Sequence, residues 1–167
     1  NLKAVHFIDS TKQLLSTFAL SKRIILGNFW SHEIDMFTDE FMQALKDKEF
    51  MLFIAPHHLA GDDFDRIKDW FDSLDDQGFE TVIWDEVGIQ GEGNIILCRL
   101  PGLLCELYPY FGHCYVANGF GRSIPSMLEP FWGGGNLYCG PRTHRSTEFD
   151  FAKQYYQEQD IHMPIVL

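Results

Sequence analysis

Short apolar segments alternate along this chain with segments whose apolar residues recur at helical spacing. The short segments span residues 23–29, 50–55, 81–84, 95–97, 114–116 and 137–139. Most of them are apolar throughout, which indicates strands buried on both faces and hence a parallel sheet covered by helices. The alternation predicts a three-layer, Rossmann-like α/β domain.

The intervening segments predict helices that each bury one face. Gly78 is expected to end the helix over residues 64–74. Shorter helices are expected over residues 103–110 and 127–131, and a last helix from about Ser146 to Gln159. The expected buried faces are Ile34, Phe37, Phe41 and Leu45 in the first helix, Phe64, Ile67, Phe71 and Leu74 in the second, and Phe149, Ala152 and Tyr156 in the last.

Size and charge restrict the function classes. The 167 residues, 46% of them hydrophobic, suffice for one domain with a sizeable core. The 13 basic and 24 acidic residues give a net charge of −11, which argues against a general nucleic-acid binder. No apolar run reaches the roughly 18 residues of a membrane span, and no signal peptide opens the chain. We therefore expect a cytoplasmic domain and, since the sequence does not begin with Met, a piece of a longer protein.

The cysteines and histidines do not form a recognisable metal motif. Cys98, Cys105, Cys114 and Cys139 have no CxxC spacing, so we expect buried free thiols in a reducing compartment rather than disulfides or a zinc site. His57 and His58 precede two aspartates, but adjacent histidines are expected to point to opposite sides of a loop. No metal is expected.

Ligands of such folds bind at the carboxyl ends of the strands, near the point where the strand order reverses. The loops expected there are residues 27–33, 56–63, 119–126 and 140–146, and Glu33 and Glu129 are the two carboxylates expected in the cleft. The third combines Gly119 and Gly121, which permit close approach of the backbone to a ligand, with Arg122, Ser123 and the start of a helix. This pattern is typical of an anion site and also of a plain tight turn.

Two further features near this loop each have two interpretations. Glu129, one turn into the helix, can accept hydrogen bonds from both hydroxyls of a ribose, or it is a surface glutamate favoured by the helix dipole. Arg142 and its neighbours form a basic loop suited to a nucleotide phosphate or acidic sugar, or a solvated loop that balances Glu148 and Asp150. The chain has no G-x-G-x-x-G after its first strand and no G-x-S-x-G elbow, which argues against NAD binding and serine hydrolysis.

The string GFGRSIPSMLEP (residues 119–130), followed after one strand by Cys139-Gly140-Pro141, resembles the donor-binding region of 3-deoxy-D-manno-octulosonic acid (Kdo) transferases. Three other segments are similar to that family in the same order. Leu26-Gly27-Asn28-Phe29-Trp30 resembles its Gly-Ser-Ser-Trp strand end, Ile54-Ala55-Pro56-His57 its Ala-Pro-His, and residues 102–108 its Gly-x-Leu-x-x-Leu-Tyr helix. The resemblance covers roughly residues 20 to 155.

The resemblance implies one half of a two-domain GT-B glycosyltransferase of lipopolysaccharide assembly. In that family the C-terminal domain binds CMP-Kdo. The N-terminal domain carries the membrane anchor, the surface for the lipid A precursor and the catalytic base. Residues 1–167 are accordingly expected to be a donor-binding domain with no catalytic residue and no cofactor, inactive without the absent N-terminal domain. The full-length protein is expected to be anchored at the cytoplasmic face of the inner membrane.

The resemblance also implies which residues bind the donor. These are Asn28, His57, Gly119, Phe120, Gly121, Arg122, Ser123, Ser126, Glu129, Gly140, Pro141 and Arg142. The chain departs from the family where Pro125-Ser126 replaces a His-Asn pair and Ala117-Asn118 a Gly-Gly pair. Two alternatives therefore stay open: a donor domain for another nucleotide sugar, and a non-catalytic nucleotide-binding module.

Overall fold

The computed structural model describes residues 12–117, 126–143, 146–158 and 165–166. Within them the chain forms an eight-stranded sheet with the order β4-β3-β5-β2-β1-β6-β7-β8. The strands are β1 (Arg23–Phe29), β2 (Met51–Pro56), β3 (Thr81–Asp85), β4 (Gly88–Gln90), β5 (Ile95–Cys98), β6 (His113–Val116), β7 (Asn136–Cys139) and β8 (Ile165–Val166).

Neighbouring strands of the sheet are parallel, with one exception. Strand β4, which the sequence does not predict, folds back antiparallel on β3 at the edge of the mostly parallel sheet. Asp85 stabilises the turn between them by accepting a hydrogen bond from the backbone N–H of Val87 at 2.9 Å. Three residues are too short a strand to display a periodicity in the sequence.

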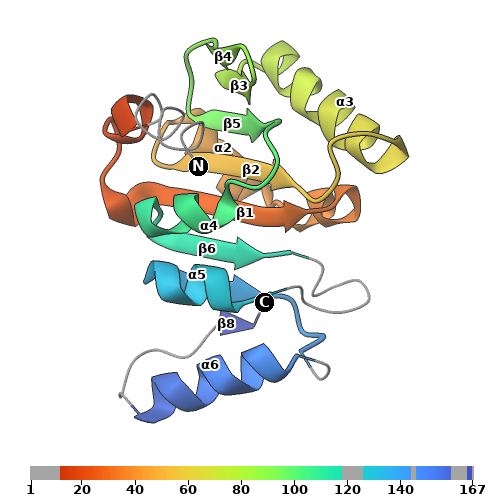
Figure 1. Ribbon diagram of the computed structural model, residues 1–167. Coiled ribbons are helices and arrows are strands. Elements are labelled where there is room, and N and C mark those ends of the chain that lie inside the picture. Colours follow the sequence, from red (N-terminus) through yellow and green to blue (C-terminus); the bar gives the residue numbers. More distant parts are fainter. Residues whose placement is uncertain (1–11, 118–125, 144–145, 159–164, 167) are drawn as a thin grey trace.

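Helices cover both faces of the sheet, which confirms the three-layer architecture (Figure 1). One face carries η2 (Ser31–Met36), α2 (Asp39–Lys46) and α3 (Asp62–Asp76), and the other carries α4 (Leu104–Leu107), η3 (Tyr108–Tyr110), α5 (Leu128–Gly133) and α6 (Thr147–Glu158). Successive strand residues alternate between the two cores: Phe53 packs with α4 and α5, whereas Leu52 and Ile54 pack with α2 and α3. The predicted faces of α3 and α6 are buried.

The single helix expected over residues 34–45 is instead two elements. Residues 31–36 form a 3-10 helix, and α2 begins only at Asp39. The break falls at Thr38, whose backbone is extended and whose hydroxyl accepts a hydrogen bond from the N–H of Phe41 at 3.2 Å. Threonine is a good N-cap because its side chain satisfies a free N–H of the first turn, so a new helix begins there.

The strand order reverses between β1 and β6. From β1 the chain builds β2, β3 and β5 on one side of the sheet, and then crosses to the other side of β1 for β6, β7 and β8. Gly27 of β1 pairs with Val116 of β6 at the carboxyl ends of the two strands. Ligands of open α/β sheets bind in the crevice at such a reversal, so the fold directs attention to this edge.

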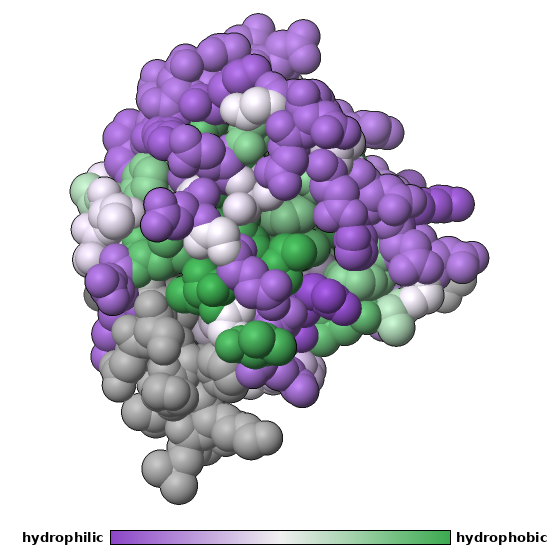
Figure 2. All heavy atoms as spheres, turned by 90° about the horizontal axis from the view of Figure 1, so that it is seen from above, coloured by the Kyte–Doolittle hydropathy of each residue, from purple (hydrophilic) through white to green (hydrophobic). Residues whose placement is uncertain are grey.

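The molecular surface at the β3–β4 edge is largely hydrophilic (Figure 2). Helix α3 carries seven aspartates, six of them exposed, and two of these lie at its C-terminal end, Asp75 and Asp76. None of the helices that the structure describes is long and apolar enough to cross a membrane. All four cysteines are free; three are buried as expected, whereas Cys105 is exposed on α4.

Candidate functional site

Two of the residues expected to bind the donor lie together at the carboxyl ends of β1 and β2. Asn28 adopts a left-handed backbone, with φ of 57°, where the β1–β2 register shifts by one residue. Its side-chain Oδ1 lies 3.4 Å from Nδ1 of His57, which directly follows β2. Asparagine tolerates this backbone better than most residues, so the bulge places a polar side chain beside the reversal point.

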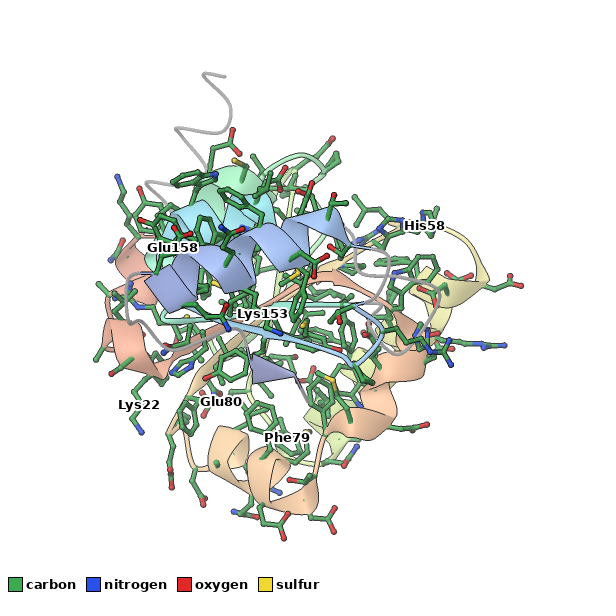
Figure 3. All side chains as sticks on the ribbon, turned by 90° about the horizontal axis from the view of Figure 1, so that it is seen from below. Lys22, His58, Phe79, Glu80, Lys153 and Glu158 are labelled. Carbon is green, nitrogen blue, oxygen red and sulfur yellow. The ribbon has the colours of Figure 1, made fainter. Side chains whose placement is uncertain are left out.

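Trp30 organises the histidines that follow β2. The ring of His57 stacks on the indole, with centroids 4.7 Å apart and planes at 22°. His58 contacts the same indole edge-on at 5.1 Å and contacts His57 at 4.5 Å. The expectation that the two histidines point apart is therefore wrong. In Figure 3, His58 lies at the edge toward which the strands of Figure 1 point, and Lys22 lies at the opposite edge.

The environment of His57 favours its neutral form. Partial burial lowers the pKa of its imidazole, the neighbouring His58 lowers it further, and the negative charge of Asp63 acts in the opposite direction. A neutral imidazole can donate one hydrogen bond and accept another. In the part of the chain that the structure describes, no three His, Cys, Asp or Glu side chains are grouped to hold a metal ion.

The turn over residues 30–33 is bonded to α3, and Phe29, just before the turn, is bonded to the residue that follows β2. Asp63, in the first turn of α3, accepts hydrogen bonds at its Oδ1 from the N–H of Ser31 at 3.1 Å and from its hydroxyl at 2.6 Å. The N–H of His57 donates to the carbonyl of Phe29 at 3.0 Å. The sequence places Trp30 in a family-like motif and Ser31 in an expected ligand loop but does not show what either contacts, because their partners lie about 30 residues away along the chain.

Glu33 was expected in the open cleft but lies within the protein. It is 2% exposed, and its Oε1 accepts a hydrogen bond from the hydroxyl of Tyr115 at 2.8 Å. Its Oε2 accepts from the N–H of Trp30 at 3.3 Å. Burial raises the pKa of the Tyr115 hydroxyl, and the charge of Glu33 raises it further, so this tyrosine remains a donor. Glu33 is therefore a buried anchor rather than a group that contacts a ligand.

Glu129 lies on the other face of the sheet, exposed in the first turn of α5. Beneath it is Tyr108, which is 1% exposed and packs so tightly on β1 that a Cβ at Gly27 would overlap its hydroxyl oxygen. Burial raises the pKa of Tyr108 strongly, and Glu129 is near enough to add to this effect. Because α5 is the helix that follows β6, its first turn, which carries the predicted ribose carboxylate, belongs to the carboxyl edge of the sheet.

A second carboxylate already occupies part of the α5 N-terminus. Oε2 of Glu148, from α6, accepts a hydrogen bond from the N–H of Met127 at 2.6 Å. The sequence predicts free N–H donors for an anion at the start of this helix. One of those donors is satisfied within the protein, so a phosphate at this edge depends on other groups.

The remaining predicted residues divide into two groups. Gly140, Pro141 and Arg142 follow β7 at the same edge of the sheet, with Gly140 buried and the other two exposed. Ser126, just before α5, is also exposed. The other five lie outside the described residues: Gly119, Phe120, Gly121, Arg122 and Ser123.

An apolar hollow of about 540 Å³ lies on the face of the sheet that carries η2 and α2. Aliphatic and aromatic side chains predominate in its wall, so it lacks the donors that a nucleotide phosphate requires. Its lining residues are Ile24, Leu26, Met36, Phe37, Phe41, Phe50, His113, Tyr115 and Tyr138. Tyr115, one of the lining residues, also donates its hydroxyl to Glu33.

Fold and site together define an open, doubly wound α/β domain with polar groups gathered where its strand order reverses. This is the architecture of nucleotide-binding Rossmann-like domains. No family model matches the chain, and no curated protein matches it by sequence.

Among solved structures, the chain is similar to the crystal structure of the C-terminal CMP-Kdo binding domain of WaaA from Acinetobacter baumannii. The two superpose with a TM-score of 0.59, and the match covers 98% of this chain and 82% of that chain. Their sequences are 16% identical, so the likeness establishes the fold. The neighbour belongs to the family that the sequence motifs resemble, and the expected fold class is confirmed.

Proposed function

We propose that this chain is the donor-binding domain of a Kdo-transferase-like glycosyltransferase and binds CMP-Kdo. The observation that carries the proposal is that Asn28 and His57 lie together at the carboxyl ends of β1 and β2, at the reversal point of this fold, while Glu129 lies in the first turn of the helix that follows β6. Four sequence motifs in family order and the structural likeness to a CMP-Kdo binding domain support the same ligand.

Each group has a chemical role in this proposal. Glu129 accepts hydrogen bonds from the two ribose hydroxyls. Asn28 and the neutral imidazole of His57 provide donors and acceptors for the sugar or the phosphate. Arg122, Ser123 and Arg142 supply charged and hydroxyl donors to the phosphate that joins CMP to the sugar, an assignment that rests on the sequence motif. Stabilising charge on the departing CMP would favour transfer.

We propose further that transfer requires a second domain, which would provide the lipid A acceptor surface, the catalytic base and the membrane anchor at the cytoplasmic face. Within the described residues, Glu33 is buried and Glu129 is assigned to ribose, which leaves neither of the two expected cleft carboxylates as a base. The reaction requires donor, acceptor and base to be brought together in one orientation.

Exposed aromatic side chains near the proposed site support a partner domain. Trp132 on α5 is 69% exposed and Phe151 on α6 is 48% exposed. Both line a groove of about 300 Å³ formed by α5 and α6, together with Leu128, Thr147 and Glu148 from the first turns of the two helices. Because helices after parallel strands begin at the carboxyl edge of the sheet, the groove borders the proposed donor site. Exposed apolar patches of this kind mark interaction surfaces.

Calorimetric titration tests the proposal. We expect CMP to bind the chain and the Glu129→Gln variant to bind it about 1–3 kcal/mol more weakly, the value of a hydrogen bond to a charged group. Glu86→Gln, at an exposed position beyond the end of β3, is the matched control and should bind like the unaltered chain. Binding of UDP or UMP in preference to CMP would favour another nucleotide sugar, and equal affinities for CMP in all three proteins would remove Glu129 from the site.

The replacement of His-Asn by Pro125-Ser126 favours a second candidate function, a non-catalytic nucleotide-binding module. Binding of CMP with no transfer when the chain is joined to an acceptor domain of a Kdo transferase would support this candidate.

A further inference from the structure

Glu33 is the one acidic residue that is both fully buried and bonded to two different elements in the described part of the chain. Burying a carboxylate is costly unless hydrogen bonds replace its hydration. Glu33 receives such bonds from the Tyr115 hydroxyl at 2.8 Å and the Trp30 N–H at 3.3 Å. Tyr115 belongs to β6 and Trp30 follows β1, so the carboxylate joins the two strands between which the strand order reverses.

Hydrogen bonds and a ring contact hold the turn over residues 30–33, which the side chain of Glu33 closes. Its own N–H donates to the carbonyl of Trp30 at 3.0 Å, so backbone and side chain bond reciprocally across residues 30–33. Asp63 of α3 holds Ser31 through two hydrogen bonds. The indole of Trp30 then stacks on His57 at 4.7 Å, and His57 reaches Asn28.

We propose that Glu33 is a positioning residue for nucleotide binding. Its bond to Tyr115 fixes Trp30, and the Trp30 ring fixes the His57 imidazole beside Asn28. The inference rests on the proposed function only for the identity of the ligand, because the arrangement itself exists without a nucleotide. The inference predicts that a change at Tyr115, which is not among the proposed donor-binding residues, alters the position of the His57 ring.

Two variants test the proposal, each with a matched control. Tyr115→Phe removes only the hydroxyl that Glu33 accepts from; its control is Tyr138→Phe, on the neighbouring strand, whose hydroxyl bonds His113 at 2.8 Å instead. Glu33→Gln replaces the carboxylate by an amide of the same shape; its control is Glu86→Gln at an exposed position. The Tyr115→Phe variant keeps the test available if Glu33→Gln does not fold.

The first readout is the proton NMR spectrum of His57 without nucleotide, measured well below the melting temperature. Stacking on an indole shifts imidazole proton signals upfield, so we expect the His57 signals to move downfield in both variants and to stay in place in both controls. The second readout is CMP affinity, which we expect to fall roughly tenfold, the effect of about one hydrogen bond.

The outcomes separate this inference from the proposed function. If the unaltered chain binds no CMP, the proposed function fails and the His57 signals alone decide whether Glu33 positions the ring. If the variants lose only thermal stability, with His57 signals and CMP affinity unchanged, Glu33 is a structural residue and the inference is overturned. Moved signals with lowered affinity in Tyr115→Phe but not Tyr138→Phe would support it.

Discussion

At the scale of single residues, Gly27 marks the closest approach between β1 and the helices over it. A Cβ at this position would overlap the hydroxyl of Tyr108, which is fully buried and cannot move into solvent. We expect Gly27→Ala to lower the free energy of unfolding by about 1–3 kcal/mol through overpacking. The additional change Tyr108→Phe removes the overlapping oxygen and should recover part of the loss. Chemical denaturation of the two single variants and the double variant measures this coupling, and strictly additive losses would contradict the contact.

The protonation of His57 makes both the stability of the folded chain and the proposed site depend on pH. Because burial and His58 lower the pKa of its imidazole, the folded chain binds fewer protons than the unfolded chain once the pH falls below the ordinary histidine value of about 6.5. The neutral His57 environment therefore contributes fully to the free energy of unfolding above that pH, and the contribution is lost as the pH falls further. A bound phosphate would favour the charged ring, so we expect the His57 pKa, measured by NMR titration, to rise when CMP is added. A pKa above 6.5 in the free chain would contradict this environment.

At the scale of elements, α5 depends on α6 for its start. Helix α5 spans only six residues. The backbone N–H of Met127, the residue just before the helix, donates a hydrogen bond to the carboxylate of Glu148 in α6. We expect Glu148→Ala to lower the free energy of unfolding by about 1–2 kcal/mol, as the loss of a helix cap does. Asp150→Ala is the control, because Asp150 lies in the same first turn of α6 and is exposed. Equal losses in the two variants, measured by chemical denaturation, would show that the helix dipole of α6 rather than the bond to Met127 is responsible.

Elements with a clear periodicity could be predicted from the sequence, whereas those fixed by capping or by distant contacts could not. The face of α3 and the burial of β2 follow from apolar spacing alone. The break before α2 depends on a hydrogen bond from Phe41 to Thr38, and β4 on a turn at Asp85, features that apolar spacing does not encode.

In the site, too, residues marked by nearby sequence could be predicted, whereas a residue fixed by a distant contact could not. Asn28 and His57 could be predicted because each follows a recognisable strand within a family-like motif. The true position of Glu33 could not, because its partner Tyr115 lies 82 residues further along the chain. In a sequence, a buried glutamate cannot be distinguished from an exposed one, because its hydrogen-bond partner is known only from the fold.

At the scale of the whole molecule, the account predicts binding without turnover. The 167 residues provide the proposed donor site, but neither expected cleft carboxylate is available as a base, and a net charge of −11 would repel an anionic lipid acceptor. An assay with CMP-Kdo and a lipid A precursor should give no product above background, with a complete Kdo transferase as the positive control. Turnover by this chain alone would overturn the need for a second domain.

The central claim is that CMP binds at the carboxyl edge of the sheet, where the strand order reverses between β1 and β6. The most direct test is a two-dimensional ¹H–¹⁵N NMR titration of this 19.4 kDa chain with CMP. We expect the amide signals of residues 27–33, 57–58, 126–129 and 140–143 to move together. Signals at the opposite edge, such as those of residues 20–22 and 91–94, should stay in place. Saturating CMP that leaves the first set unmoved, or that moves only the second set, would contradict the claim.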